Sequence, residues 1–366
     1  MRAALLEAPG KPFAVIDDLE VAEPRIGEVR VRVSNCGICH SDMTYADSGP
    51  GVAVPVVLGH EAAGVVEAVG PGVRSVARGD KVMLTPLGSC GRCYFCARSQ
   101  PTLCSDAQHF MTGLMPDGSS PLSRRKQLVY RGFAVAGFGE ETVVSEAGCV
   151  KLPSDTPLDV ACVIGCAIQT GVGAVLNTAR VEEGASVFVG GLGGIGISIV
   201  QGARIAGASR IIVSDPVAAR REAAGRFGAT HALDPGSDDV VARLQDLTNG
   251  IGVDYAFDGA GSTQVMQQCI AASRRGGTSV LVGAPSGLAS LEIPIVSLFL
   301  SQEKRVIGSL LGSCHSQRDV PRFLDFWRRG LLDLEGMISQ RRPIEQIREG
   351  FEDMRAARGI RTVLSF

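Results

Sequence analysis

The sequence lacks the features that bring a protein to nucleic acid or to a membrane. Its 366 residues carry a formal net charge of −2. No run of about five or more lysines and arginines is present to attract a phosphate backbone. No stretch approaches about 18 uninterrupted apolar residues, and residues 1–7 contain no apolar core of an export signal. We therefore expect a cytoplasmic protein that binds neither nucleic acid nor membrane.

Cysteines, in contrast, are numerous for a sequence without an export signal. Eleven are present, and because reducing compartments keep thiols free, we expect metal binding rather than a disulfide framework. Some of them lack a partner at ligand spacing and are interpreted as buried apolar side chains. These are Cys36, Cys149, Cys269 and Cys314.

Length and composition predict a globular protein of two or three domains. A single domain takes roughly 100 to 200 residues, and this sequence is 45% apolar and 20% charged. Residues 28–33 alternate between charged and apolar side chains, which favours a half-buried antiparallel strand. Frequent glycines and prolines follow, so the first part of the chain is predicted to be mostly β.

Strands alternate with helices after a predicted helical region over 158–176. The apolar runs there are continuous, as in parallel strands that are covered on both faces. The runs are 186–190, 210–214, 253–257 and 279–282, with helices predicted over 194–206 and 218–227. A later helix over 320–329 and a final strand over 362–366 are expected to return to the first domain.

These patterns predict an α/β protein in three segments. A β-rich domain is expected over 1–167, a parallel-sheet domain over 168–310, and a return to the first domain over 311–366. The polar and glycine-rich stretch Asp106–Gly139 is interpreted as an inserted loop that shapes a substrate pocket.

Four cysteines lie within fifteen residues, in the segment GSCGRCYFCARSQPTLC. Two residues between successive thiolates let a tight turn direct both sulfurs to one centre, and four sulfurs complete a closed tetrahedral shell. The loop over 90–104 is therefore predicted to hold a structural zinc through Cys90, Cys93, Cys96 and Cys104. An iron–sulfur cluster and four unligated thiols are the alternatives.

A second set of metal-binding residues is dispersed along the chain. It comprises Cys39 in CGICHSD, His60 in GHE, and either Cys162 or Cys166, between which spacing does not decide. Two thiolates and an imidazole are a known ligand set for catalytic zinc, and they leave the fourth position open for water or substrate.

A glycine fingerprint follows the apolar run SVFVG and begins a helical pattern, as a dinucleotide site requires. The free N–H groups at the start of this predicted helix would face the pyrophosphate of the cofactor. The residues predicted to line the cofactor are Gly191, Gly193, Gly194, Ile195 and Gly196.

An acidic residue ends the next apolar strand, about 24 residues after the first fingerprint glycine. This residue, Asp215, would accept hydrogen bonds from both ribose hydroxyls and repel the extra phosphate of NADP, so NAD is the predicted cofactor. Arg220 could flank the adenosine ribose or belong to a solvated helix face.

Together these motifs resemble the medium-chain, zinc-containing alcohol dehydrogenases over nearly the whole chain. The segments that carry the resemblance are GHEAAGVVEAVGPGV with GDKV, the four-cysteine loop, IGCAIQTGVGAV, VGGLGGIG and IRTVLSF. The resemblance implies a Rossmann-type coenzyme domain, a GroES-like catalytic domain, two zinc ions per chain, and a homodimer or homotetramer. The strand near Ser309 would pair between subunits.

The resemblance also implies residue roles at the catalytic zinc. Cys39, His60 and Cys166 would be its ligands. Glu61 would lie behind the metal and coordinate it transiently, and Asp42 would orient the imidazole of His60.

Further roles concern the proton and the cofactor. Ser41 would take the proton of a bound alcohol, whose hydride passes to nicotinamide in a cleft between the domains. His40 and Arg361 would contact the cofactor phosphates, and Thr170 would lie near the nicotinamide. Thr44 stands where many family members carry a histidine of the proton relay, so the proton's exit route is open.

The substrate is a small alcohol, aldehyde or ketone whose identity the sequence leaves open. A thiol-dependent formaldehyde dehydrogenase shares every motif and would be recognised by a requirement for added thiol. A zinc lyase or hydratase would produce no NADH. A non-catalytic nucleotide sensor is the third rival, against which the co-occurrence of Ser41, Asp42 and Glu61 argues.

Overall fold

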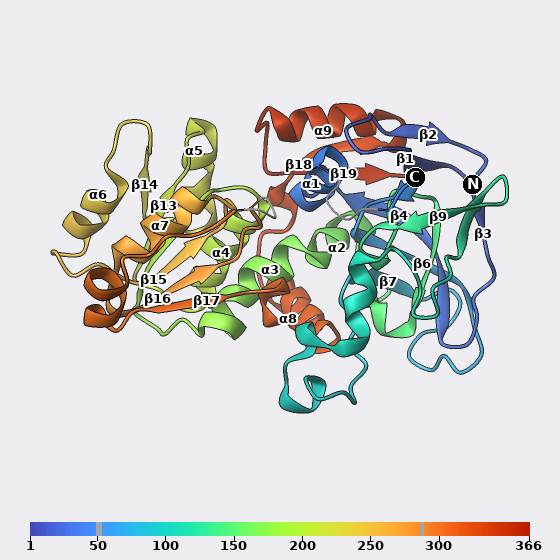
Figure 1. Ribbon diagram of the computed structural model, residues 1–366, viewed down its shortest axis with the longest axis horizontal. Coiled ribbons are helices and arrows are strands. Elements are labelled where there is room, and N and C mark those ends of the chain that lie inside the picture. The colour runs from blue at the N-terminus through green and yellow to red at the C-terminus, as the bar shows by residue number, and fades with distance from the viewer. Residues whose placement is uncertain (49–52, 286–288) are drawn as a thin grey trace. The chain divides into compact units, whose positions relative to one another are not determined.

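The computed structural model describes residues 1–48, 53–285 and 289–366, and the chain divides into two units (Figure 1). Unit 1 consists of Met1–Cys166, His315–Asp325 and Leu334–Phe366. Unit 2 consists of Ala167–Cys314 and Phe326–Asp333.

Unit 1 is built mainly of strands, as the alternating patterns predicted. Its larger sheet has the order β11-β7-β6-β4-β19-β18, with β10 also paired to β4. The bounds are β4 Glu28–Gly37, β6 Glu61–Val69, β7 Lys81–Leu84, β10 Glu141–Ser145, β11 Cys149–Lys151, β18 Ile338–Pro343 and β19 Arg361–Ser365. Val29, Val31 and Val33 are buried on the inner face of β4. The predicted final strand is confirmed as β19, which pairs antiparallel with β4.

A second sheet of unit 1 corrects one prediction. Its order is β2-β1-β5-β9-β8-β3, with bounds β1 Ala3–Leu6, β2 Ala14–Ile16, β3 Glu20–Val21, β5 Val56–Val57, β8 Leu122–Arg124 and β9 Gln127–Arg131. The interpretation of Asp106–Gly139 as an inserted loop was wrong, because β8 and β9 form a hairpin within it. Leu122 and Val129 face each other there and are buried. The apolar runs were too short to stand out among polar residues.

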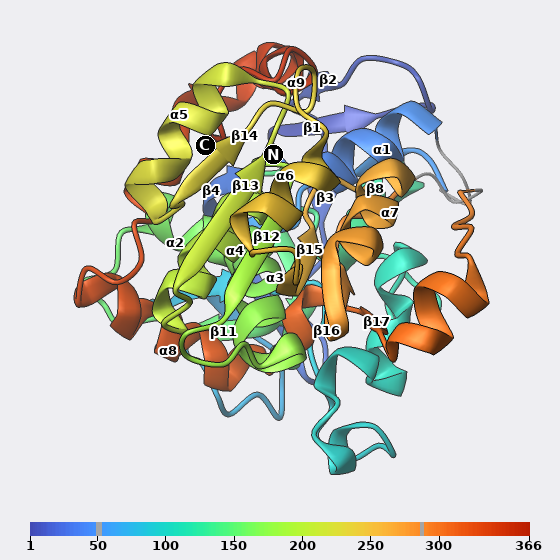
Figure 2. The same ribbon diagram turned by 90° about the vertical axis from the view of Figure 1, so that its left-hand side faces the viewer.

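Unit 2 is a parallel sheet in the order β14-β13-β12-β15-β16-β17 (Figure 2). Its strands are β12 Ser186–Gly190, β13 Arg210–Ser214, β14 His231–Leu233, β15 Val253–Asp258, β16 Ser273–Leu281 and β17 Arg305–Gly308. Its helices include α3 Ala167–Gly173, α4 Gly194–Ile205, α5 Ala218–Phe227, α6 Val240–Leu247 and α7 Thr263–Ala272. Consecutive residues of β12, Val187 to Val189, are all fully buried, so helices cover both faces of the sheet.

The C-terminal part is shared between the units. It contains α8 Ser316–Arg328 and α9 Ile347–Arg355. The sequence had assigned all of 311–366 to the first domain, whereas Phe326–Asp333 belongs to unit 2. Side-chain contacts explain the difference, because the Asp333 N–H donates to Gln201 and the Asp333 carboxylate pairs with Arg226.

Among the described residues, no single helix is long and apolar enough to cross a membrane. One bent pair, Leu158–Gly165 with Ala167–Ala179, meets the criterion by length and composition only.

Candidate metal and dinucleotide sites

The dispersed ligand set comes together in unit 1. One ligand atom each of Cys39, His60 and Cys166 lies within 4.8 Å of the others. Strand register explains how two of them meet, because Gly37 at the end of β4 pairs with Glu61 at the start of β6. Cys39 lies two residues after Gly37, and His60 immediately precedes Glu61. The two side chains therefore emerge at the same sheet edge.

The structure places Cys166, and not Cys162, beside the other two donors. Cys166 lies after the short helix η6, Cys162–Gly165, and joins the other two ligands. The thiol of Cys162 instead donates a hydrogen bond to the Asp159 carbonyl oxygen at 3.2 Å. Gly165 permits the close approach, since a Cβ there would lie 3.2 Å from the Glu61 Cα.

Asp42 holds the imidazole of His60 in position. Its Oδ1 lies 3.0 Å from His60 Nδ1 and accepts the Gly59 N–H at 3.0 Å, while its Oδ2 accepts the Cys39 N–H at 3.1 Å. Burial opposes protonation of His60, but Asp42 and Cys39 raise its pKa well above the ordinary value. A hydrogen bond to a carboxylate at Nδ1 leaves Nε2 available to bind a metal.

The three donors fit zinc. Donor atoms around a tetrahedral zinc lie about 3.5 Å apart, given bonds of about 2.0–2.3 Å, which is compatible with the 4.8 Å limit here. The Cys166 thiol donates to Cys39 and lowers the pKa of Cys39 well below its usual range. A buried thiolate beside an imidazole matches the soft donor set that zinc prefers.

Ser41 and His40 lie in the first turn of α1, His40–Ser48. Ser41 Oγ is 3.8 Å from Cys39 Sγ, so the hydroxyl adjoins the ligand set. His40 and Thr44 are exposed on the same helix. The helix thus carries one hydroxyl at the candidate metal site and two residues that reach solvent.

Arg361 lies beside Glu61, next to the ligand set. Its Nη1 donates to the Ile38 carbonyl at 2.9 Å and its Nη2 is 3.4 Å from Glu61 Oε1, with both side chains buried. Burial raises the pKa of Glu61 to about 8 although Arg361 opposes the shift. The sequence had assigned Arg361 only to the cofactor phosphates, and this ion pair was not foreseen.

An aromatic side chain that the sequence did not single out packs on His60 of the candidate metal cluster. The Phe133 ring centroid lies 4.6 Å from that of His60 and 5.3 Å from that of Tyr45. Phe133 adopts φ +52°, a strained conformation for a bulky residue. The buried guanidinium of Arg131 donates to the Ala134 and Val143 carbonyls and holds this turn.

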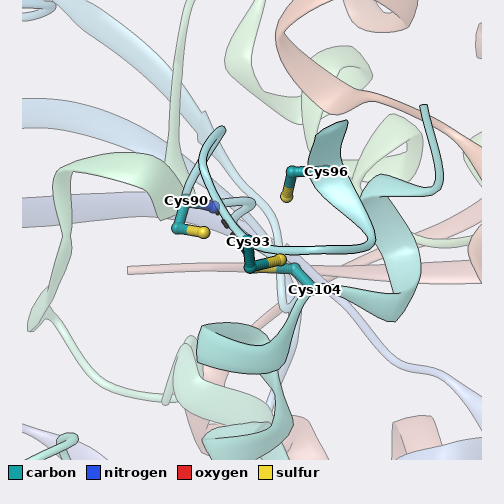
Figure 3. Close-up of side chains that lie close together, drawn as sticks. All are labelled: Cys90, Cys93, Cys96 and Cys104. Atoms are coloured by element: carbon teal, nitrogen blue, oxygen red, sulfur yellow. Dashed lines mark hydrogen bonds between the residues drawn. The ribbon is translucent and has the colours of Figure 1, made fainter. Parts of the chain in front are cut away.

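The four-cysteine loop forms a second cluster, again within 4.8 Å (Figure 3). The Cys90 N–H donates to Cys104 Sγ at 3.3 Å. N–H groups of the loop lower the pKa of Cys93 to about 6, whereas burial raises that of Cys96 to about 12. Four sulfurs this close cannot all ionise without a cation, and a tetrahedral zinc supplies it.

The glycine fingerprint has the geometry of a dinucleotide site. Gly191 adopts φ +89° after β12, and Gly193 caps the N-terminus of α4 with open space beside its Cα. A Cβ at Gly196 would overlap the Gly191 carbonyl, so only glycine permits this helix to start so near the strand. Gly194 and Ile195 form the first turn of α4, whose free N–H groups favour an anion.

Asp215 supports this turn. Its Oδ2 accepts the Leu192 N–H at 2.7 Å and its Oδ1 accepts the Val217 N–H at 2.8 Å. Each oxygen keeps a further lone pair for a ribose hydroxyl. Of the two neighbouring arginines, Arg221 binds the Asp215 carbonyl and the Asp234 carboxylate. Thr170 is buried in α3 of the same unit.

Asp42→Ala is expected to weaken zinc binding at the Cys39 cluster and to reduce turnover by about 10- to 100-fold, because the imidazole loses the group that orients it. Zinc release during dialysis against a graded chelator series measures the first effect. Asp42→Asn keeps one acceptor oxygen and should lose less. Zinc retention by the alanine variant equal to that of the wild type would refute the role of Asp42.

Two family models match the chain. Residues 25–154 match the alcohol dehydrogenase GroES-like domain, and residues 194–329 match the zinc-binding dehydrogenase domain. An S-(hydroxymethyl)glutathione dehydrogenase of Haemophilus influenzae is 38% identical, over 100% of this chain and 97% of the relative.

Solved structures show the same likeness. An alcohol dehydrogenase zinc-binding domain protein from Burkholderia ambifaria has a TM-score of 0.95 at 36% identity and covers 100% of this chain and 98% of its own. The benzyl alcohol dehydrogenase of Acinetobacter calcoaceticus has a TM-score of 0.94 at 30% identity, with coverage of 100% and 99%.

Proposed function

The chain belongs to the zinc-containing alcohol dehydrogenase family, and on this premise we propose that the Cys39, His60 and Cys166 cluster is its catalytic metal site. One observation carries the proposal: the three donors lie within 4.8 Å, and the described residues provide no fourth donor in that group. Zinc held by three protein donors leaves a position for a substrate oxygen and acts there as a Lewis acid.

The residues around the cluster have distinct proposed roles. Ser41 accepts the proton of the alcohol, and its place beside Cys39 supports this. Asp42 keeps His60 in the binding tautomer. Glu61 is a transient ligand, and the Arg361 guanidinium beside it opposes the rise of its pKa and so favours the carboxylate form that binds a metal.

The cofactor is NAD, which accepts the hydride. We propose that the turn over 191–196 binds its pyrophosphate and that Asp215 binds the adenosine ribose, with Arg220 flanking it. The open space at Gly193 and the hydrogen-bonded carboxylate of Asp215 support these roles. Contacts of His40, Thr170 and Arg361 with the cofactor are proposed from the family resemblance.

The proposed substrate is a hydroxymethyl thioether formed from formaldehyde and a thiol. Relatives named for S-(hydroxymethyl)glutathione span the whole chain at 37–38% identity. Such an adduct is a primary alcohol: its carbon loses a hydride to NAD and its hydroxyl loses a proton. The products are an S-formyl thioester, NADH and one proton.

An aromatic alcohol is the second candidate. The benzyl alcohol dehydrogenase structure resembles the whole chain. The Phe133 ring packs against His60, and the Tyr45 ring packs against Phe133. Aromatic pairs add about 0.5–1.5 kcal/mol beyond area burial, so these rings would favour a benzylic substrate.

The two candidate substrates are distinguished by measuring NADH absorbance with each of them separately. With formaldehyde, added glutathione is expected to raise kcat/KM by about tenfold or more, since the free aldehyde hydrate lacks the binding contacts of the adduct. A higher kcat/KM for benzyl alcohol than for the adduct would favour the second candidate. No NADH from either substrate or from a broad alcohol panel would refute the dehydrogenase activity.

We also propose that two copies associate through β17. Among the described residues this strand pairs only with β16, so one side of its backbone is an open edge. The exposed apolar residues Ile295, Val296 and Leu300 precede it in the chain, which supports a second copy as the partner.

A further inference from the structure

A buried carboxylate ends strand β15. Asp258 is fully buried, and its Oδ1 accepts the N–H groups of Ala260 and Gly261, both at 3.0 Å. Burial raises the pKa of this carboxyl, and backbone N–H groups oppose the shift. The side chain therefore closes a tight turn over residues 258–261 at the carboxyl end of the parallel sheet.

This turn packs directly on the glycine fingerprint. The Gly259 N–H donates to the Gly190 carbonyl at 2.8 Å. A Cβ placed on Gly191 would lie 2.7 Å from the Ala260 Cβ, and one placed on Gly259 would lie 3.1 Å from the Gly196 Cα. Two of the fingerprint glycines, Gly191 and Gly196, thus rest against residues whose conformation Asp258 sets.

The turn that follows β16 also contacts Asp258. The N–H groups of Val282 and Gly283, which follow β16, donate to the Asp258 carbonyl at 3.3 and 3.0 Å. A Cβ on Gly283 would lie 2.9 Å from Asp258 Oδ2, so the carboxylate fills the space between the two turns. Asp258 therefore joins the chain segments that leave β12, β15 and β16.

We infer that Asp258 is a positioning residue of the dinucleotide site, which fixes the turn on which Gly191 and Gly196 rest. The inference rests on the proposed binding of pyrophosphate by the fingerprint. Backbone N–H groups recognise an anion only when they are held within about 0.5 Å of the productive geometry. Removal of the carboxylate takes the charged acceptor away from the part-buried N–H groups of Ala260 and Gly261, so the turn is no longer held in this conformation.

Asp254 provides a matched control on the same strand. Its Oδ2 accepts the N–H and the hydroxyl of Ser186 at 2.8 and 2.7 Å, and its Oδ1 accepts Arg274 Nε at 2.7 Å. The Gly261 N–H also reaches Asp258 Oδ2 at 3.3 Å, so each of the two carboxylates accepts three hydrogen bonds. Those of Asp254 lie at the amino end of the sheet, away from the fingerprint, so their loss costs stability without moving the cofactor turn.

The test is an NADH titration of the full-length protein, followed by nicotinamide fluorescence, beside a thermal melt. Asp258→Ala is expected to weaken NADH binding by about tenfold or more, and Asp258→Asn, which keeps an acceptor oxygen, by less. In turnover the KM for NAD rises while the KM for the alcohol at saturating NAD is unchanged. Asp254→Ala lowers the melting temperature but binds NADH as the wild type does.

Two outcomes overturn the inference: wild-type NADH affinity in a folded Asp258→Ala or Asp258→Asn protein, or equal weakening by Asp254→Ala, which would indicate a general loss of stability. Failure of the wild-type protein to bind NADH would instead refute the proposed function. If Asp258→Ala does not fold, Asp258→Asn carries the comparison.

Discussion

Cys39→Ala is expected to abolish turnover while NADH binding remains measurable. The substitution removes one of three donors, and a metal held by the remaining thiolate and imidazole is lost readily. Transition-state stabilisation of several kcal/mol goes with it, which corresponds to a loss of about 10³-fold or more in kcat/KM. The fingerprint lies in the other unit, so the cofactor should still bind. Steady-state NADH formation, zinc analysis and an NADH titration measure the three quantities.

Cys162→Ala is the matched control for this prediction. Cys162 is buried and lies four residues before Cys166, yet its thiol binds the Asp159 carbonyl and stays outside the ligand group. The variant should keep about two zinc ions per chain, as the ligand sets require, and most of its activity. Turnover by Cys39→Ala at the wild-type rate, or loss of the same zinc from Cys162→Ala, would contradict the ligand assignment.

Cys104→Ala is expected to cause the largest loss of stability. Cys104 is the buried member of the four-cysteine cluster and accepts the Cys90 N–H. Without it the loop over 90–104 loses its zinc and the constraint that the metal supplies. We expect the melting temperature to fall by roughly 10 °C, because losing a structural metal costs several kcal/mol and each kcal/mol shifts a unit of this size by about 2–4 °C.

Cys149→Ala serves as the control for the loop. Cys149 is fully buried in β11 but belongs to neither cluster. The Cys149→Ala protein should lose only the packing of one sulfur and should keep its zinc. A Cys104→Ala protein with unchanged zinc content and an unchanged melting temperature would show that the cluster is not a structural metal site.

Local sequence patterns predicted the parallel sheet well. The predicted bounds of β12, β13 and α5 agree with the structure at both ends, because continuous apolar runs are buried on both faces and are bounded by turns. The hairpin of β8 and β9 was missed because each strand shows too few residues to establish a period of two.

The metal and cofactor sites were predicted in part, for a physical reason. The residue types of Cys39, His60 and the four-cysteine loop indicate metal chemistry by themselves. The choice of Cys166 over Cys162 depends on a through-space arrangement that the pairing of Gly37 with Glu61 helps to create. Spacing along the chain does not contain that information.

Residues that act through packing were not foreseen. Phe133 lies far from His60 in sequence, and its position follows from a strained turn that Arg131 holds. Asp258 ends an apolar strand just as Asp215 does. The sequence FDGAG, an acid before a glycine-rich turn, was the available signal for it.

The most direct test of the account is a crystal structure of the zinc-loaded protein with anomalous scattering measured at the zinc edge. Two peaks per chain are expected, one among the four loop cysteines and one bound by Cys39 Sγ, His60 Nε2 and Cys166 Sγ. The fourth ligand of the second ion should be a water or an added alcohol. A single peak in the loop, or a permanent fourth protein ligand that closes the second site, would contradict the proposed chemistry.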